Sequence, residues 1–249
     1  MTKQSAHNRT LVSVVIPVFN EEDNLSKLVH RTAEALKERS SWELLLVLDG
    51  CTDGSLNTAL SLLHEGFPLR IFDLGQGYGQ HPAIHTGLAQ AQGQFIVTLD
   101  ADLQNPPEAI PDILAMLEDG ADAVGTIRKN RQDSTRRHLA SALFRGVLTT
   151  LRFRHPMKDP GCMLRGWKRE VVLDFLSTGQ GALYLPLQMN EFAQTYVEFE
   201  TAHGPRQSGQ SRYSALNLAR LFTKVLTLKD PRGVPCSLPP RTVAEYCKG

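Results

Sequence analysis

Short apolar runs alternate with amphipathic stretches along the first half of the chain. Five runs have the length of buried strands, and between them apolar residues recur at helical spacing. The predicted strands are Leu11–Ile16, Glu43–Leu48, Leu69–Asp73, Phe95–Leu99 and Ala121–Ile127. The predicted helices have their apolar stripes at Leu25–Leu36, Leu56–Leu63, Ala83–Ala91 and Ile110–Leu117. This alternation predicts an α/β fold in which helices cover both faces of a mostly parallel sheet.

Polar residues follow the predicted strands at the points where they end. Asn20, which is suited to cap the first helix, follows the first strand, Asp49 the second, and Asp100 and Asp102 the fourth. Open α/β sheets bind ligands outside the carboxyl ends of their strands. If the chain stays extended, Asp100 and Asp102 point to the same side, about 6–7 Å apart. Because hard cations take oxygen ligands, the pair indicates a divalent metal, with a simple acidic turn as the alternative.

The alternation stops after Arg128. Two basic amphipathic stretches follow, one from Leu139 to Leu151 and one over residues 214–229. Each is typical either of a solvated surface helix or of a helix lying on an anionic membrane. Residues 1–10 are polar and are expected to be flexible, and the proline-rich residues 230–249 are expected to form an irregular tail. No run approaches the ~20 apolar residues of a transmembrane helix.

Composition and motifs narrow the classes of function. The chain has 249 residues and a net charge of +1, which gives no general case for nucleic-acid binding. Its four cysteines form no Cys-x-x-Cys pair and suit a reducing cytoplasm. The glycines of Gly75–Gly79 lack the dinucleotide-binding spacing, and the pair His81 and His85 lacks the glutamate of a zinc-protease motif.

Six blocks together resemble the family-2 inverting glycosyltransferases of GT-A (Rossmann-like) fold, in particular the polyprenyl-phosphate branch. The blocks are Val15–Glu21, Tyr78–His81, Leu99–Glu108, Val124–Asp133, Asp159–Arg165 and Arg206–Tyr213. The resemblance runs from Leu11 to Leu228. It implies a glycosyltransferase domain over residues 11–213, followed by an amphipathic interfacial helix over 214–229.

The resemblance also implies roles for individual residues. The residues expected to hold the nucleoside of a nucleotide-sugar donor are Pro17, Asn20, Glu21 and Asp49. Those expected to bind Mg²⁺ or Mn²⁺, and through it the donor diphosphate, are Asp100, Asp102 and Gln104. Those expected near the donor or acceptor phosphates are Arg128, Arg131, Arg206, Ser211 and Arg212. Asp159 is the candidate base, and the alternative is that Asp159 orients Arg165 or the sugar. Arg165 is also expected to contact the substrates.

The function implied is metal-dependent transfer of a sugar from a nucleotide-sugar, with UDP-sugar as the expected donor, to a polyprenyl phosphate. The expected place is peripheral, at the cytoplasmic face of the cell membrane, in cell-envelope glycan or lipopolysaccharide modification. The chain departs from the family at Leu48, where an aspartate is usual, at Gln76–Gly77, and in lacking two C-terminal transmembrane helices. These departures leave open a soluble or protein acceptor, or a nucleotide-sugar-binding subunit with weak catalysis. A homo-oligomer is also left open.

Overall fold

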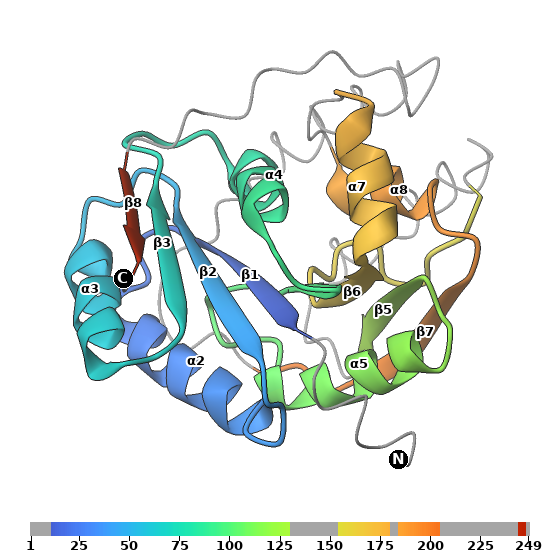
Figure 1. Ribbon diagram of the computed structural model, residues 1–249, viewed down its shortest axis with the longest axis horizontal. Coiled ribbons are helices and arrows are strands. Elements are labelled where there is room, and N and C mark those ends of the chain that lie inside the picture. Colours follow the sequence, from blue (N-terminus) through green and yellow to red (C-terminus); the bar gives the residue numbers. More distant parts are fainter. Residues whose placement is uncertain (1–10, 130–153, 180–183, 205–243, 248–249) are drawn as a thin grey trace, which may run out of the picture.

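The computed structural model describes residues 11–129, 154–179, 184–204 and 244–247. It confirms the predicted alternation of strands and helices up to residue 128 (Figure 1). The elements of this part are β1 (Val12–Val18), α2 (Glu22–Ala35), β2 (Trp42–Leu48), α3 (Ser55–Glu65), β3 (Leu69–Asp73), α4 (Gln80–Gln90), β4 (Phe95–Thr98), the 3-10 helix η1 (Pro107–Ala109), α5 (Ile110–Glu118) and β5 (Ala123–Arg128). Nearly every residue of β1, β2 and β4 is buried, as expected of strands covered on both faces.

The hydrophobic pattern does not predict the remaining elements. They are β6 (Arg165–Lys168), α7 (Arg169–Ser177), α8 (Leu185–Asn190), β7 (Tyr196–Thr201) and β8 (Ala244–Cys247). β6 has four residues, two of them charged, and most residues of β7 are partly exposed. β8 lies within residues 230–249, so the tail is not irregular throughout.

One sheet contains all eight strands of the described residues, in the order β7-β5-β6-β4-β1-β2-β3-β8. The pairs β1–β2, β1–β4, β2–β3 and β5–β7 are parallel, so the sheet is mostly parallel as predicted. β6 runs antiparallel to both of its neighbours, β4 and β5, and β8 runs antiparallel to β3. Strand β6 therefore joins the two parallel parts of the sheet.

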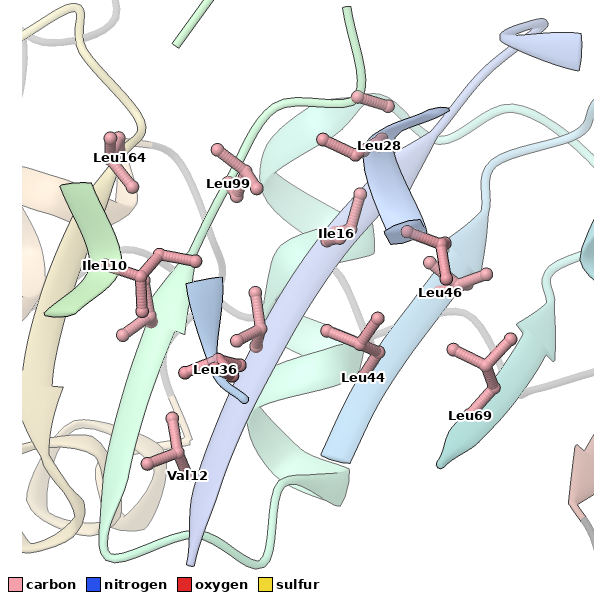
Figure 2. Packing of buried hydrophobic residues seen from close by; sticks show 14 of the residues in the cluster. Val12, Ile16, Leu28, Leu36, Leu44, Leu46, Leu69, Leu99, Ile110 and Leu164 are labelled. Carbon is pink, nitrogen blue, oxygen red and sulfur yellow. The ribbon is translucent and has the colours of Figure 1, made fainter. Parts of the chain in front are cut away.

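Helices cover both faces of this sheet, which gives the protein two hydrophobic cores. Helices α2, α3 and α5 pack on one face, and α4, α7 and α8 on the other (Figure 1). Figure 2 shows part of the first core, in which Ile16 of β1, Leu46 of β2 and Leu28 of α2 pack together, all of them fully buried. Because the helices cover the two faces of the sheet, polar side chains gather at the carboxyl ends of the parallel strands.

The end of β1 differs from the sequence expectation at two residues. The strand continues through Pro17, which is tolerated because β4, the neighbour on that side, makes its last contact with β1 at Val15. Asn20 does not cap α2, because its backbone has a φ of 53° and its side chain binds Thr52 instead. Asn20 thus ties the end of β1 to the loop after β2.

Several expectations concern segments that the structure does not describe. These are the flexible residues 1–10, the basic stretch from Leu139 to Leu151 and the interfacial helix over residues 214–229. In the described residues, no helix has the length and apolar character that crossing a membrane requires.

Candidate active site

Parallel strands bring the predicted site residues to one edge of the sheet. β5 runs in the same direction as β4, because β6 between them is antiparallel to both. Arg165 of β6 pairs with Thr98 on one side and with Gly125 on the other, so these two residues lie at the same level. Arg128, three residues after Gly125, therefore lies level with the turn that follows β4.

That turn carries the acidic pair, and neighbouring side chains hold it in place. Asp100 Oδ1 accepts a hydrogen bond from Gln80 Nε2 at 2.5 Å, and its Oδ2 accepts one from Asn105 Nδ2 at 3.3 Å. Asp102 Oδ1 accepts from the backbone N–H of Gln104 at 3.1 Å. Both carboxylates are half-buried. The first residue of α4 and the turn after β4 are thus joined by hydrogen bonds into one polar unit.

The acidic pair lies in a tight turn and not on an extended strand. β4 ends at Thr98, and Leu103 adopts a left-handed φ of 61°. The 6–7 Å spacing expected for an extended Asp-x-Asp therefore does not apply. The side chain of Leu103 is buried, and this contact with the core anchors the turn.

Asp49 fastens the glycine-rich loop to the end of β2. Its carboxylate is buried and accepts hydrogen bonds from the backbone N–H groups of Tyr78, at 2.6 Å, and Gly79, at 2.9 Å. The nucleoside contact expected of Asp49 stays a prediction, and any such contact has to share oxygens that already accept these bonds. Tyr78 itself is 44% exposed, and its hydroxyl accepts a hydrogen bond from Gln76 Nε2.

Gly50 allows the loops after β2 and β3 to touch backbone to backbone. It has a φ of 69°, and a Cβ at this position would lie 2.3 Å from the backbone nitrogen of Gly77. Real Cβ atoms do not approach backbone atoms so closely, so the two loops interlock only with glycine here.

Asn20 and Glu21 lie beside Asp49 at the same edge. Asn20 Oδ1 accepts from the backbone N–H of Thr52 at 2.8 Å, and Glu21 Oε2 accepts from Asn24 Nδ2 at 2.7 Å. Glu21 is buried, while Asn20 and Pro17 are partly exposed. Their expected role in holding a nucleoside stays a prediction.

Arg128 and Asp159 form a bidentate ion pair at the end of β5. Arg128 Nε donates to Asp159 Oδ2 at 2.7 Å, and Nη2 donates to Oδ1 at 2.9 Å. Burial opposes the charge of Arg128, but the hydrogen bond and the negative charge of Asp159 raise the pKa of Arg128 above its usual value. The candidate base is thus held by an arginine that sequence comparison places near phosphates.

Arg165 lies beneath this pair and is fully buried. Its Nε donates to Cys162 O at 2.7 Å, its Nη1 to Tyr196 Oη at 2.7 Å, and its Nη2 to the backbone carbonyl of Asp159 at 2.5 Å. The direct contact with substrate that is expected from the sequence would require Arg165 to leave these acceptors. The geometry instead favours the alternative in which Asp159 and Arg165 orient one another.

Four expected site residues lie outside the described part of the chain, namely Arg131, Arg206, Ser211 and Arg212. The structure does show where the segment that carries the last three of them begins. The backbone N–H of Gly204 donates to Gln104 O at 2.9 Å. Gly204, the last described residue before this segment, therefore lies next to the acidic turn.

Comparison with known proteins gives this arrangement a family. The family model described as glycosyl transferase family 2 matches residues 13–174. The chain belongs to glycosyl transferase family 2. This result confirms the family expected from the sequence blocks, and it makes the protein a glycosyltransferase.

Two curated relatives illustrate the match of this family-2 chain. The undecaprenyl-phosphate 4-deoxy-4-formamido-L-arabinose transferase of Proteus mirabilis is 43% identical over 220 residues, which cover 87% of this chain and 67% of the relative. The protein of the same name from Pseudomonas fluorescens is 42% identical over 220 residues, covering 87% of this chain and 64% of the relative. The chain thus spans about two thirds of the length of these relatives.

Solved structures confirm the GT-A fold of this glycosyltransferase. Glucosyl-3-phosphoglycerate synthase from Mycobacterium tuberculosis, in complex with Mn²⁺, UDP and phosphoglyceric acid, gives a TM-score of 0.68 at 18% identity, covering 98% of this chain and 88% of that one. A second mycobacterial protein gives a TM-score of 0.69 at 19% identity, covering 94% and 78%. At these identities the likeness shows the fold alone.

The acidic turn of this family-2 chain fits a divalent cation. Asp100 and Asp102 offer hard oxygen donors, and Mg²⁺ is typically held by one or two carboxylates together with the phosphates of a substrate. Within residues 11–129, 154–179 and 184–204, no group of three His, Cys, Asp or Glu side chains could hold a metal. A carboxylate pair that shares its cation with a diphosphate agrees with this donor set.

Sequence reasoning missed two residues that orient the acidic pair. Gln80 and Asn105 both donate to Asp100. Both lie within sequence blocks that carry the family resemblance, and this was the signal available for finding them.

Leu48 is fully buried in the first core, where it packs with apolar neighbours.

His81, directly after Gln80, is expected to make folding stability depend on pH. Both of its ring nitrogens are buried without a hydrogen-bond partner in the described chain, and burial lowers its pKa from 6.5 to about 4. The unfolded chain then binds more protons than the native one below pH 6.5, so stability falls as the pH drops. We expect the wild type to lose about 2 kcal/mol between pH 7 and pH 5 through this residue, a loss that His81→Gln removes. Urea unfolding at both pH values measures the loss of unfolding free energy. Equal losses in the wild type and in His81→Gln would contradict the prediction.

Proposed function

We propose that this glycosyltransferase moves a sugar from a UDP-sugar to a polyprenyl phosphate with inversion at the anomeric carbon. One observation carries the proposal. An acidic pair suited to a cation and an arginine suited to phosphate lie level at one sheet edge. They do so in a chain that is 43% identical to a transferase named for undecaprenyl phosphate and 4-deoxy-4-formamido-L-arabinose.

On this proposal, Asp100, Asp102 and Gln104 hold Mg²⁺ or Mn²⁺ against the donor diphosphate. The bound cation supplies positive charge that stabilises the leaving nucleoside diphosphate. The chain's own contribution is to fix the ligands. Gln80 and Asn105 orient Asp100, and the backbone N–H of Gln104 orients Asp102, so little reorganisation is needed when the donor binds.

The acceptor is already an anion, so it needs positioning more than deprotonation. Arg128 is suited to this task, because arginine binds phosphate oxygens through a planar fork of N–H donors. Further phosphate contacts are proposed for Arg131, Arg206, Ser211 and Arg212. The nucleoside contacts are proposed for Pro17, Asn20, Glu21 and Asp49, which lie at or just after the ends of β1 and β2, at the same edge.

A polyprenyl phosphate lies in a membrane, so we propose that the protein works peripherally at its cytoplasmic face, in cell-envelope glycan or lipopolysaccharide modification. Sedimentation with liposomes that contain anionic lipid tests this placement. The protein is expected to sediment at low salt and to be released by high salt. Failure to bind at low salt would favour a soluble or protein acceptor. Homo-oligomerisation stays a prediction, and sedimentation velocity tests it.

The transfer activity is tested with undecaprenyl phosphate in detergent micelles and a panel of UDP-sugars that includes UDP-glucose and UDP-4-deoxy-4-formamido-L-arabinose. UDP release is expected to require both undecaprenyl phosphate and Mg²⁺ or Mn²⁺, and the product is expected to be lipid-linked. Donor binding by calorimetry without turnover would favour a nucleotide-sugar-binding subunit instead. No binding of any UDP-sugar would refute the proposal.

A further inference from the structure

Within the described part of the chain two arginines contact Asp159, and they differ in exposure and in the nitrogen atoms that still lack an acceptor. Each nitrogen of the buried Arg165 side chain already donates a hydrogen bond to the protein. Arg128 uses Nε and Nη2 for the Asp159 carboxylate, whereas its Nη1 donates no hydrogen bond within the described part of the chain. Arg165 is also fully buried, so Arg128, which is partly exposed and has an uncommitted Nη1, is the one of the two that can offer N–H groups to an anion.

Arg128 also lies where a phosphate would be bound. It is level with the turn after β4, and Asp100 in that turn is close enough to act on it electrostatically. Its side chain is 13% exposed, and the exposed Gly161 passes its Nη2 without a side chain. A Cβ at Gly161 would approach Nη2 to 3.1 Å, so the glycine leaves the guanidinium room on that side.

The backbone of Asp159 is fixed independently of its carboxylate. Its carbonyl accepts hydrogen bonds from Arg165 Nη2 at 2.5 Å and from Cys162 N at 3.3 Å. The next carbonyl, of Pro160, accepts from Tyr184 Oη at 2.7 Å. On this rigid turn the carboxylate receives three hydrogen bonds from Arg128, including one from its backbone N–H at 3.2 Å. The turn therefore determines the orientation of the guanidinium.

We propose that Asp159 is a positioning residue, which aims the Arg128 guanidinium at a phosphate oxygen of the substrates, and that Arg165 sets the turn on which Asp159 stands. This inference rests on the proposed sugar transfer to a phosphate acceptor, and it replaces the role of base expected for Asp159.

The chemistry of the transfer supports this assignment. An acceptor phosphate oxygen forms a bond to the anomeric carbon as the bond from that carbon to the donor diphosphate breaks. The bonding electrons stay on the diphosphate oxygen, and no proton has to leave the acceptor. A carboxylate at this place is thus useful for holding a cationic side chain and not for removing a proton.

A double-mutant cycle on the transfer reaction tests the proposal, with Asp159→Asn, Arg128→Gln and both together. Each single substitution is expected to lower kcat/KM by about 100-fold, because a charge-assisted fork is lost or misaligned. The double variant is expected to be no worse than Arg128→Gln alone. A double variant about 100-fold below Arg128→Gln would overturn the proposal, since a base contributes whether or not Arg128 is present.

The same variants show which phosphate Arg128 contacts. A raised KM for undecaprenyl phosphate in both single variants assigns the contact to the acceptor, and a raised KM for the UDP-sugar assigns it to the donor. Binding of UDP with Mn²⁺, and of undecaprenyl phosphate in nanodiscs, is measured on the same proteins by calorimetry. These binding constants allow the double-mutant cycle to be completed even if the wild type gives no turnover. Absence of turnover would count against the proposed function but not against the positioning role of Asp159. Unchanged binding and KM for both ligands would refute the positioning role.

A matched ion pair controls for loss of stability. Arg39 and Glu118 form another bidentate, mostly buried pair, at the opposite edge of the sheet where α2 and α5 end. Glu118→Gln is expected to lower thermal stability as Asp159→Asn does and to leave KM unchanged. If Arg128→Gln does not fold, Arg128→Lys serves instead. It is expected to keep part of the activity only while Asp159 is present, and equal activity of Arg128→Lys with and without Asp159→Asn would contradict the proposal.

Discussion

Replacing Asp102 by asparagine is expected to lower sugar transfer by at least about 10³-fold, because on the proposed role of the acidic turn a carboxylate that holds the cation is lost and several kcal/mol of charge stabilisation go with it. The fold should survive, since Asp102 is half-buried in a turn whose anchor is the apolar side chain of Leu103. The measurement is UDP release with undecaprenyl phosphate at saturating Mn²⁺, together with a thermal melt. Removing divalent cations from the wild type with EDTA is expected to give the same loss.

Asp119→Asn provides the matched control, because this exposed aspartate ends α5 outside the site. It is expected to leave both transfer and melting temperature unchanged. Full activity of Asp102→Asn at saturating Mn²⁺ would remove the metal role from the acidic turn.

Gly50→Ala is expected to destabilise the protein by about 3 kcal/mol. This loss combines the strain of a positive φ with a clash between the new Cβ and the backbone. The new Cβ would lie 2.3 Å from the nitrogen of Gly77 and 2.5 Å from the carbonyl carbon of Gln76. Both are backbone atoms, which cannot swing aside as the end of a flexible side chain can. The whole loop therefore has to move to make room for the Cβ. Because Asp49 holds that loop beside the residues proposed to bind the nucleoside, donor affinity should fall as well.

Gly120→Ala separates the two causes. Gly120 also has a positive φ, of 115°, but a Cβ there would meet nothing within 4 Å. This variant should therefore show backbone strain alone, about 1 kcal/mol. Urea unfolding of both variants gives the comparison, and equal losses would show that the two loops separate without cost.

The first half of the fold is predictable because each strand from β1 to β5 is a largely buried apolar run, and a helix follows each of the strands β1 to β4. β6 cannot be found in this way. Its four residues include two that are charged. One of these, Arg165, is fully buried, and the hydrogen bonds that satisfy it go to partners three to thirty-one positions away. The left-handed backbone of Asn20 is likewise decided by Thr52, a contact across two strands that no local propensity contains.

The site shows the same division between local pattern and long-range contact. The place of Asp100 and Asp102 follows from the strand that precedes them, because parallel strands end at a common edge. The pairing of Arg128 with Asp159 depends on β6 being inverted between β4 and β5, which the hydrophobic pattern does not reveal. Motif comparison assigned these two residues separate roles, and only the geometry shows that they act on one another.

The hydrogen bonds of the loops at this edge have an electrostatic consequence. A helix N-terminus carries a partial positive charge, and many nucleotide-binding proteins place a phosphate there. Here the chain's own carboxylates already occupy these ends. Glu22 lies in the first turn of α2 and accepts from Gly54 N before α3, Asp53 accepts from the first N–H groups of both helices, and Asp49 accepts from the N–H groups before α4. A diphosphate bound beside α2 or α3 would therefore meet helix ends that the chain's own carboxylates already neutralise. In the proposed transfer its counter-charge comes instead from a cation and from arginines, and the way these helices begin gives a structural reason for the metal of that proposal.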